Sequence, residues 1–430
     1  MSWLWVPFLW ISLGGVLWAL SKTVRQGKMS PELARKGIHI SLGVPVLTLP
    51  WLFDHHLHVW VLLTGAVVML LALRTRKQGL GAGLHSVARS SIGEFAYIGG
   101  VLVVWHLAKD QPRIYLASLL VLMISDAVAA LVGVRYGRLK YISLSGSKSW
   151  EGSLAFLLSA TLIIYAVLGL NRPTEFAQLL TLALTVALLV MMMEAVSWQG
   201  WDNLFVPVAV CILLQQYLSL PLPELLLRFG VLVALFGLLQ RSKRSSLLSD
   251  GGALAAVLAG YFSYVLGDGV LLMTVLLFFS GYVASTRIHP SQETRIHDLP
   301  AVLAITGPTF LWALLGWRTN TFYGIEIIGI YSTQLGCTLV ARPQSGPVPG
   351  NASFSALRSW ALCALPTLGS YHLLHHPVPA EIFASLLFIG LLHTHLFRYW
   401  LTRNPHPTET RRWQLHALIG FSSSILIWCF

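Results

Sequence analysis

The sequence predicts an all-α, polytopic integral membrane protein with about 14 to 16 transmembrane helices in two halves, for three reasons. Hydrophobic residues make up 55% of the 430 and charged residues only 11%, whereas a soluble domain carries roughly 25% charged residues. The apolar residues form runs of helix length, and lipid admits only helices or closed barrels. The basic residues lie in alternate connecting segments, as in a chain that crosses a bilayer repeatedly.

Each apolar run is one predicted span, although several are shorter than the ~20 residues that cross a bilayer straight. We expect tilted or broken helices among them. The predicted spans lie near residues 3–20, 38–53, 57–73, 94–108, 114–134, 152–170, 177–196, 204–219, 225–239, 252–266, 270–285, 301–316, 324–340, 357–372, 381–397 and 414–430.

The loop charges predict the orientation. With the N-terminus outside, most of the 29 Lys and Arg lie in inside loops, so the basic side is cytoplasmic by the positive-inside rule. The first span, Trp3 to Leu20, has no basic leader and no small-residue cleavage site, which indicates a retained span. No transit peptide precedes it, so we expect a prokaryotic inner (plasma) membrane or a thylakoid membrane, with the active site on the cytoplasmic side.

The composition also excludes some functions. The formal charge of +12 is spread over many loops rather than gathered in a patch, so no nucleic-acid partner is expected. The four cysteines are scattered in apolar runs without paired spacing and predict neither a zinc site nor a disulfide framework.

Two stretches divide the chain into halves: the proline-containing Leu-Pro-Leu-Pro-Glu at 220–224 and the basic Arg-Ser-Lys-Arg at 241–244. Each half has a Gly-rich loop after its fifth span, which suggests a diverged duplication. The predicted domains are an N-terminal transmembrane anchor at 1–24 and two membrane domains at 25–222 and 223–430.

The first candidate site residue is Asp126, an acid about 12 Å inside an apolar helix. A charge at such depth costs a few kcal/mol, so it usually binds or pairs with something. We interpret Asp126 as a Mg²⁺ ligand; the alternative is a structural acid paired with a neighbouring helix. Gly133 and Gly137 follow on the same helical face and would let a helix or a nucleotide approach the backbone.

The next segment predicts an anion site. Ser145, Gly146 and Ser147 precede Lys148 at an expected helix start, where free amides and a lysine suit phosphate. Lys148 would neutralise phosphate, and Glu151, three residues on, would bind the metal or orient the lysine. The alternative is a topology-setting lysine with a Glu that matches the helix dipole.

Other polar residues converge on the cytoplasmic side of the predicted topology. His39 follows two cations at the start of the second span and is the candidate general base; a histidine that is merely hydrogen-bonded at the interface is the alternative. Arg89 begins the fourth span and is a candidate for nucleotide binding. The closing segment adds Glu194 and Asp202 as candidate metal ligands and Asn203 as a candidate for nucleotide binding.

These segments together resemble the phytol/dolichol kinase family, the CTP-dependent polyprenol kinases. The resemblance implies phosphoryl transfer from CTP, with UTP as the alternative donor, to a long-chain isoprenoid alcohol, with Mg²⁺ as cofactor. The matching motifs are R-K-x-x-H-x-x-x-G at 35–43, R-x-x-x-G-E at 89–94, D-x-x-A-x-x-x-G-x-x-x-G at 126–137, K-S-W-E-G-S at 148–153, and E-A-x-S with D-N-x-x-x-P at 194–207.

The second half resembles the phytyl-phosphate kinases in a degenerate form. It keeps Ser-Asp-Gly-Gly at 249–252 and Thr-Gln-Leu-Gly at 333–336, but Gly329 stands where the family has an Asp and Gln334 where it has a Glu. Without those acids we expect a non-catalytic half that packs or guides lipid. An altered second kinase is the alternative.

Two other functions stay open at this point. The middle motifs also resemble phosphatidate cytidylyltransferases, although the H-G-G signature of those enzymes is absent. Many spans, an apparent duplication and intramembrane acids also suit a lipid transporter or lipid-binding protein. The expected partners are a nucleotide, membrane lipids and an isoprenoid alcohol such as phytol, geranylgeraniol, farnesol or a polyprenol; the choice of alcohol and the oligomeric state are not predicted.

Overall fold

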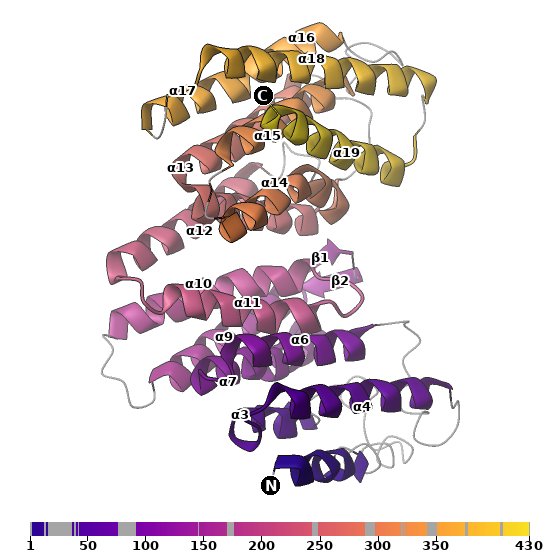
Figure 1. The fold of residues 1–430 in the computed structure, drawn as a ribbon, viewed down its shortest axis with the longest axis vertical. Coiled ribbons are helices and arrows are strands. Elements are labelled where there is room, and N and C mark those ends of the chain that lie inside the picture. Colours follow the sequence, from indigo (N-terminus) through magenta and orange to yellow (C-terminus); the bar gives the residue numbers. More distant parts are fainter. Residues whose placement is uncertain are drawn as a thin grey trace. The chain divides into compact units, whose positions relative to one another are not determined.

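The structure is a computed structural model in which helices account for almost all regular elements (Figure 1). It divides into two compact units, Met1–Gly230 and Val231–Phe430, which we describe separately. The structure describes residues 2–12, 14–15, 37, 40–41, 43–75, 92–144, 146–169, 176–242, 248–288, 297–319, 321, 323–341, 351–374, 377–404 and 407–429.

Unit 1 contains the short helices η1 (Ser2–Leu4), α3 (Leu49–Leu52) and α7 (Pro112–Leu120), the π-helical turn η3 (Val121–Ser125), and one hairpin of β1 (Lys140–Ser143) and β2 (Gly146–Ser149). The other helices of unit 1 are α4 (His56–Thr75), α6 (Gly93–Ala108), α8 (Asp126–Tyr136), α9 (Trp150–Gly169), α10 (Phe176–Val196) and α11 (Asp202–Tyr217), followed by the start of α12 (Leu222–Ser242).

Long-range helix packing forms the core of unit 1. Helix α9 packs against both α8 and α10, and α11 packs against α6, α7 and α10 (Figure 1). Helices α7, η3 and α8 follow one another directly and form a single apolar run from Pro112 to Tyr136. A π-helical turn inside a helix is rare and is often found at functional sites; here it ends directly before Asp126.

The hairpin corrects one sequence prediction. We predicted a loop and then a helix that opens at Lys148, but residues 140–149 pair as antiparallel strands and α9 begins only at Trp150. The strand pairing places Lys148 opposite Tyr141 and Gly146 opposite Ser143. Gly146 has a φ of 114°, which glycine adopts readily and which allows the tight turn between the strands.

Unit 2 is built from the rest of α12 and from eight further helical segments among its described residues. Its core includes Leu271 and Phe278 packed with Ile327, Tyr331 and Leu335. The segments after α12 are α13 (Asp250–Ile288), α14 (Leu299–Thr319), α15 (Gly324–Val340), α16 (Ala352–Ser359), η5 (Trp360–Ala364), α17 (Leu365–Leu374), α18 (Ala380–Arg403) and α19 (Glu409–Trp428).

The long element α13 folds back on itself. A Cβ added to Gly260 would lie 4.0 Å from the Val275 side chain, yet a straight helix would separate these residues by about 22 Å. The chain between them contains Gly267 and Gly269, so α13 corresponds to the two separate spans that the sequence predicts at 252–266 and 270–285.

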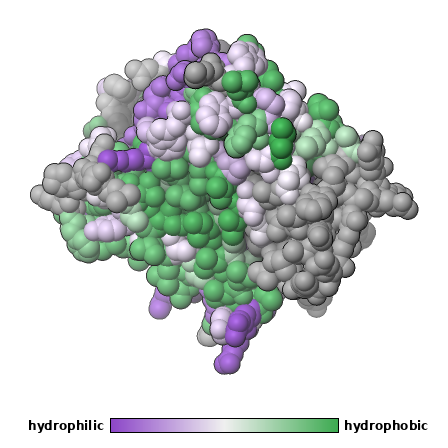
Figure 2. All heavy atoms as spheres, turned by 90° about the horizontal axis from the view of Figure 1, so that it is seen from below, coloured by the Kyte–Doolittle hydropathy of each residue, from purple (hydrophilic) through white to green (hydrophobic). Residues whose placement is uncertain are grey.

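The apolar helices confirm the prediction of a polytopic membrane protein. Among the described residues, six helices are long and apolar enough to cross a membrane, and four shorter apolar helices of 10–17 residues accompany them. On the face that Figure 2 shows, hydrophobic side chains cover a continuous area, and hydrophilic side chains gather at two opposite edges of it. A continuous apolar area of this kind is what membrane proteins present to lipid.

Candidate functional site

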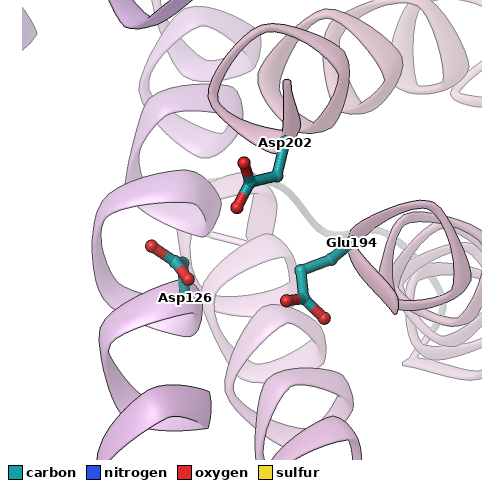
Figure 3. Close-up of side chains that lie close together, drawn as sticks. All are labelled: Asp126, Glu194 and Asp202. Carbon is teal, nitrogen blue, oxygen red and sulfur yellow. The ribbon is translucent and has the colours of Figure 1, made fainter. Parts of the chain in front are cut away.

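Three carboxylates meet in unit 1. Asp126 comes from the first turn of α8, Glu194 from the last turn of α10 and Asp202 from the first turn of α11. One oxygen of each lies within 4.8 Å of the other two (Figure 3). The link between α10 and α11 is short, which explains why Glu194 and Asp202 lie close together. The three residues form the acid cluster.

Lys148 binds the most enclosed member of the acid cluster. Its ammonium lies 2.7 Å from Glu194 Oε1 and also donates to the Glu194 backbone carbonyl. That carbonyl belongs to the last turn of α10, where it also accepts from the Ser197 amide at 3.2 Å, and the end of a helix favours a cation. Burial alone would lower the pKa of Lys148, but the Glu194 carboxylate outweighs it and the pKa is raised, so the lysine stays charged.

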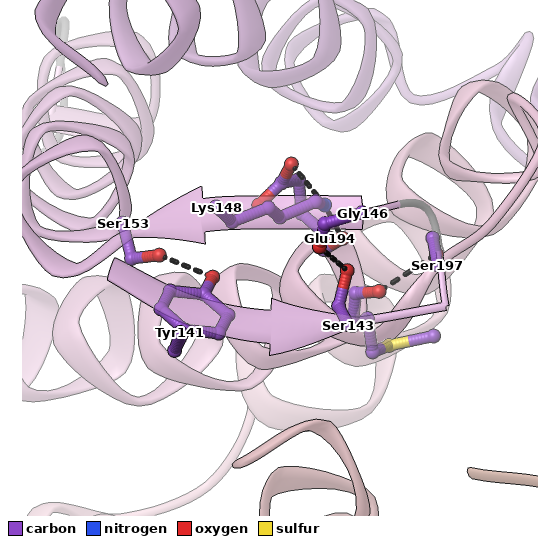
Figure 4. A network of polar contacts seen from close by, with 8 residues as sticks. Tyr141, Ser143, Gly146, Lys148, Ser153, Glu194 and Ser197 are labelled. Atoms are coloured by element: carbon purple, nitrogen blue, oxygen red, sulfur yellow. Dashed lines mark hydrogen bonds and ion pairs between the residues drawn. The ribbon is translucent and has the colours of Figure 1, made fainter. Parts of the chain in front are cut away.

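The hairpin directs Lys148 toward the acid cluster. Tyr141 lies opposite Lys148 in the strand pairing, so the two side chains share one face of the hairpin. The Tyr141 and Ser153 hydroxyls share a hydrogen bond of 2.8 Å, which ties this face to α9 (Figure 4). Tyr141 is buried, and burial followed by the nearby Glu194 charge raises its pKa to about 12. Tyr141 and Ser153 were not among the predicted site residues, and Lys-Tyr-Ile-Ser has no polar–apolar alternation that would have signalled a strand.

Glu151 has a structural contact instead of a contact with Lys148. Its carboxylate accepts hydrogen bonds from the backbone amides of Arg138, at 2.9 Å, and Leu139, at 3.0 Å. These amides lie directly before β1, so Glu151 anchors the start of the hairpin to the first turn of α9. The prediction that Lys148 and Glu151 project together from one helical turn is wrong, because Lys148 is on a strand.

Gly133 in α8 and Gly137, the residue directly after α8, are closely packed. A Cβ added to Gly137 would lie 2.6 Å from Ser149 Oγ at the end of β2, and one added to Gly133 would lie 3.1 Å from the same atom. Gly152 faces them, since its Cβ would lie 2.9 Å from the Ala129 carbonyl. The structure shows the approach of α9 at Gly133 and of the last residue of β2 at Gly137; nucleotide binding at both stays a prediction.

Asn203 holds the start of α11. Its side-chain amide donates to the Gly93 carbonyl at 3.0 Å, and the Ile92 backbone amide donates to the Gln199 backbone carbonyl at 3.2 Å. Together these contacts fix the beginning of α6 against the turn that carries Asp202. Asn203 therefore helps to position Asp202. Its contact with a nucleotide stays a prediction.

The remaining predicted residues divide into two groups. Gly146 forms the hairpin turn, where its carbonyl accepts from Ser143 Oγ at 3.3 Å. Ser147 is exposed and lies opposite Ile142, on the hairpin face away from Lys148. His39, Arg89 and Ser145 lie outside the described residues.

The acid cluster suits a hard divalent cation. Asp126, Glu194, Asp202 and Lys148 together carry a formal charge of −2, from three carboxylates and one ammonium. Mg²⁺ prefers carboxylate oxygens together with waters and substrate phosphates. All candidate metal-ligand atoms in the acid cluster are carboxylate oxygens. The residues present therefore fit Mg²⁺ and do not favour a softer metal.

Unit 2 lacks a comparable arrangement in its described part. A Cβ added to Gly329 would lie 2.8 Å from the Leu386 side chain, so an acid would not fit there without repacking. Gln334 donates to the His416 carbonyl, and its own side-chain oxygen lies 2.6 Å from His416 Nδ1. Among the residues that the structure describes, Asp126, Glu194 and Asp202 are the one group of three acidic, histidine or cysteine side chains close enough to share a metal ion.

Comparison with known proteins agrees with the resemblance to the phytol/dolichol kinases. A phytol kinase of Synechocystis sp. (strain PCC 6803) is 32% identical over 210 residues, which cover 88% of that protein and 46% of this chain. The chain belongs to the phytol kinase family. The relationship extends to an uncharacterised protein of Methanocaldococcus jannaschii, 27% identical over 197 residues, 95% of that protein and 44% of this chain.

Each of these matches covers less than half of the chain. No protein-family model matches the chain and no solved structure matches it. The resemblance of residues 223–430 to the phytyl-phosphate kinases therefore stays a prediction, as do the functional assignments of the three predicted domains. The boundary between the two units lies inside α12, after Gly230, and is close to the predicted boundary at residue 222.

Proposed function

We propose that the chain is a membrane-bound prenol kinase that transfers the γ-phosphate of CTP to the hydroxyl of a long-chain isoprenoid alcohol and forms the prenyl monophosphate. One observation carries the proposal: in a member of the phytol kinase family, the acid cluster and Lys148 meet where apolar helices end. A lipid alcohol and a charged donor can both reach such a place.

The chemistry asks the protein mainly to position and neutralise the phosphates. In phosphoryl transfer the charge spreads over the oxygens of the transferred group, and fixed cations stabilise it. Mg²⁺, when bound, would supply positive charge that neutralises the phosphates. Asp126, Glu194 and Asp202 would hold the metal ion, and Lys148 would offer its ammonium to a phosphate oxygen.

The two anchors of the hairpin contribute to this role. Glu151 holds the start of the hairpin and Tyr141 holds the face that carries Lys148. A lysine fixed in this way loses little conformational freedom when phosphate binds, and this pre-organisation favours the transition state. We retain His39 as the proposed general base for the alcohol proton.

The depth of the acid cluster suits a lipid alcohol. Asp126 lies ten residues before the end of α8, which places it about 15 Å along the axis from Tyr136. An isoprenoid chain would stay among the apolar helices while its hydroxyl approaches the carboxylates. Phytol, geranylgeraniol, farnesol and longer polyprenols all satisfy this geometry.

The test uses membranes that contain the full chain, a panel of these prenols, and CTP labelled at either the α- or the γ-phosphate. We expect γ-label in a prenyl monophosphate and no α-label in lipid. The same assay with labelled UTP and ATP ranks the donors. Transfer of α-label to a lipid when phosphatidate is supplied would instead indicate a cytidylyltransferase.

Matched variants connect the activity to the site. Asp126→Asn and Lys148→Ala should abolish transfer, whereas Asp110→Asn, an exposed acid at the end of α6 in the same unit, should leave it unchanged. Full activity in both site variants would end the proposal.

A further inference from the structure

The hairpin and the residue directly before it expose large aliphatic side chains. Leu139 is 65% exposed, Ile142 is 67% exposed and Leu144 is 43% exposed. We call these three residues, with the exposed Arg138 and Lys140, the hairpin surface. A connecting loop that faces only water rarely presents three large aliphatic side chains close together.

The strand register produces this surface. Side chains alternate along β1, so Tyr141 and Ser143 are buried while Lys140 and Ile142 are exposed. Tyr141 shares its inner face with Lys148. The register that directs Lys148 toward Glu194 therefore also forces Ile142 outward, and the exposure of Ile142 is a fixed feature of the fold.

The position of the hairpin in the chain places it at a membrane boundary. It connects two helices that are each long and apolar enough to span a bilayer, one ending at Tyr136 and the next beginning at Trp150. Tyr and Trp are enriched where membrane helices enter the head-group region. Residues 137–149 follow one span directly and precede the next, so they lie at the surface of the bilayer.

The charge of this segment has one sign. Residues 135–149 contain Arg135, Arg138, Lys140 and Lys148 but no Asp or Glu. Lys148 is paired with Glu194, and the Glu151 carboxylate lies beside the segment on the Arg138 and Leu139 amides. The three other cations outnumber this one acid, so the outer part of the segment keeps a net positive charge. Arg135 and Tyr136 also contact each other, with the guanidinium 5.4 Å from the ring centroid. Basic residues beside a bilayer are attracted to anionic lipid head groups.

We propose that the hairpin surface is an interfacial anchor that binds anionic phospholipid. Leu139, Ile142 and Leu144 insert among the lipid head groups, and Arg138 and Lys140 contact the lipid phosphates. The combination of aliphatic and basic side chains favours a membrane surface over a soluble anion, because a soluble anion would leave the aliphatic side chains in water. This contact goes beyond the proposed kinase activity and does not depend on it.

The test is a fluorescence measurement on the full chain. An environment-sensitive NBD probe is attached to Ile142→Cys after the exposed Cys429 is changed to Ser; the other three cysteines are buried. The protein is placed in nanodiscs of phosphatidylcholine alone or of phosphatidylcholine with phosphatidylglycerol. We expect the emission to shift to the blue when phosphatidylglycerol is present, and high salt to reverse the shift because it screens the charges.

Two further variants sharpen the measurement. Arg138→Gln with Lys140→Gln keeps both backbone amides and should require roughly tenfold more anionic lipid for the same shift. A probe at Leu158→Cys, which is 60% exposed and lies eight residues, about 12 Å, into the following span, should report hydrocarbon in both lipids. If Ile142→Cys disturbs folding, Leu139→Cys provides a second probe position.

Two outcomes would overturn the proposal. One is emission typical of water, or emission that is the same with both lipids and at both salt concentrations. The other is a shift on addition of CTP or inorganic phosphate in phosphatidylcholine nanodiscs without any response to phosphatidylglycerol, since Arg138 and Lys140 would then serve a soluble anion. Neither outcome depends on whether the chain phosphorylates a prenol.

Discussion

The Lys148 ammonium contacts Glu194 twice, at the side-chain carboxylate and at the backbone carbonyl. Glu194 is only 9% exposed and belongs to the acid cluster with Asp126 and Asp202. A single lysine thus connects the hairpin to the end of α10 and to the candidate metal ligands. This contact links local strand structure to the proposed phosphate chemistry.

Replacing Lys148 should reduce phosphoryl transfer strongly. In Lys148→Met the side chain keeps its length but loses its charge, so the transferred phosphate would lack a fixed cation. We expect a fall in kcat/KM of about 10²- to 10³-fold, typical for the loss of one electrostatic contact to a transition state. Lys148→Arg keeps the charge and should retain part of the activity. Initial rates at a saturating prenol and varied CTP give kcat/KM for CTP in both variants. A Lys148→Met value close to that of the unaltered protein would contradict the role.

The raised pKa of Lys148 predicts a flat pH dependence in the neutral and mildly basic range. A lysine whose pKa is higher in the folded than in the unfolded state stabilises the fold fully below the unfolded value of about 10.4. The stabilisation disappears only as the pH rises through the higher folded value.

We therefore expect the difference in thermal stability between the unaltered protein and Lys148→Met to stay constant from about pH 7 to about pH 10. Thermal unfolding of the detergent-solubilised chain measures it. A difference that vanishes near pH 8 would mean that Lys148 has a lowered pKa and is neutral in the site.

Changing Glu151 should separate an anchoring role from metal binding. Glu151→Ala removes the acceptor of the Arg138 and Leu139 amides, so the hairpin would hold Lys148 less firmly. We expect kcat to fall by roughly tenfold because the ammonium is less well oriented. The Mg²⁺ concentration for half-maximal rate should stay unchanged. Glu151→Gln keeps one acceptor oxygen and should lie between; a shifted Mg²⁺ requirement would show that Glu151 is a metal ligand after all.

The close packing at Gly137, directly after α8, should not tolerate a methyl group. In Gly137→Ala the new Cβ would clash with the Gly133 carbonyl and lie 2.6 Å from Ser149 Oγ, so the end of α8 and β2 must shift at a cost of about 1–3 kcal/mol. The matched control is Gly230→Ala, since nothing lies within 4 Å of a Cβ there. That change should be neutral or stabilise by up to about 1 kcal/mol. Unfolding in detergent compares them, and equal stabilities would argue against the close packing.

Much of the fold could be predicted from the sequence because long apolar runs leave a membrane chain few alternatives. The helices α10 (Phe176–Val196) and α15 (Gly324–Val340) fall where the sequence places spans, at 177–196 and 324–340. Even the reversal inside α13 was expected, since polar and glycine residues interrupt the apolar run near Asp268.

The hairpin could not be predicted in the same way. Each strand has only four residues, and Gly-Ser-Lys-Ser in β2 offers no hydrophobic alternation. The strands are held instead by contacts distant in the sequence, from Glu151 to the amide of Arg138 and from Tyr141 to Ser153. A single sequence does not reveal these partners.

The acid cluster could be predicted in part. The positive-inside rule placed Asp126, Glu194 and Asp202 toward one side of the membrane, but only the packing of α8, α10 and α11 brings their oxygens within 4.8 Å. Sequence reasoning also assigned nucleotide contacts to Gly133, Gly137 and Asn203; the structure shows the packing contacts of these residues, and their nucleotide contacts stay predictions. The roles of His39, Arg89 and Ser145 stay predictions.

Binding of Mn²⁺, a paramagnetic substitute for Mg²⁺, tests the central claim most directly. Electron paramagnetic resonance of the purified chain with Mn²⁺ and CTP reports the number of bound ions and, through phosphorus hyperfine coupling, their contact with phosphate. We expect one bound ion per chain with phosphorus coupling, and at least tenfold weaker binding in Asp126→Asn with Asp202→Asn. Equal Mn²⁺ affinity in this double variant, or bound Mn²⁺ without phosphorus coupling, would contradict the account.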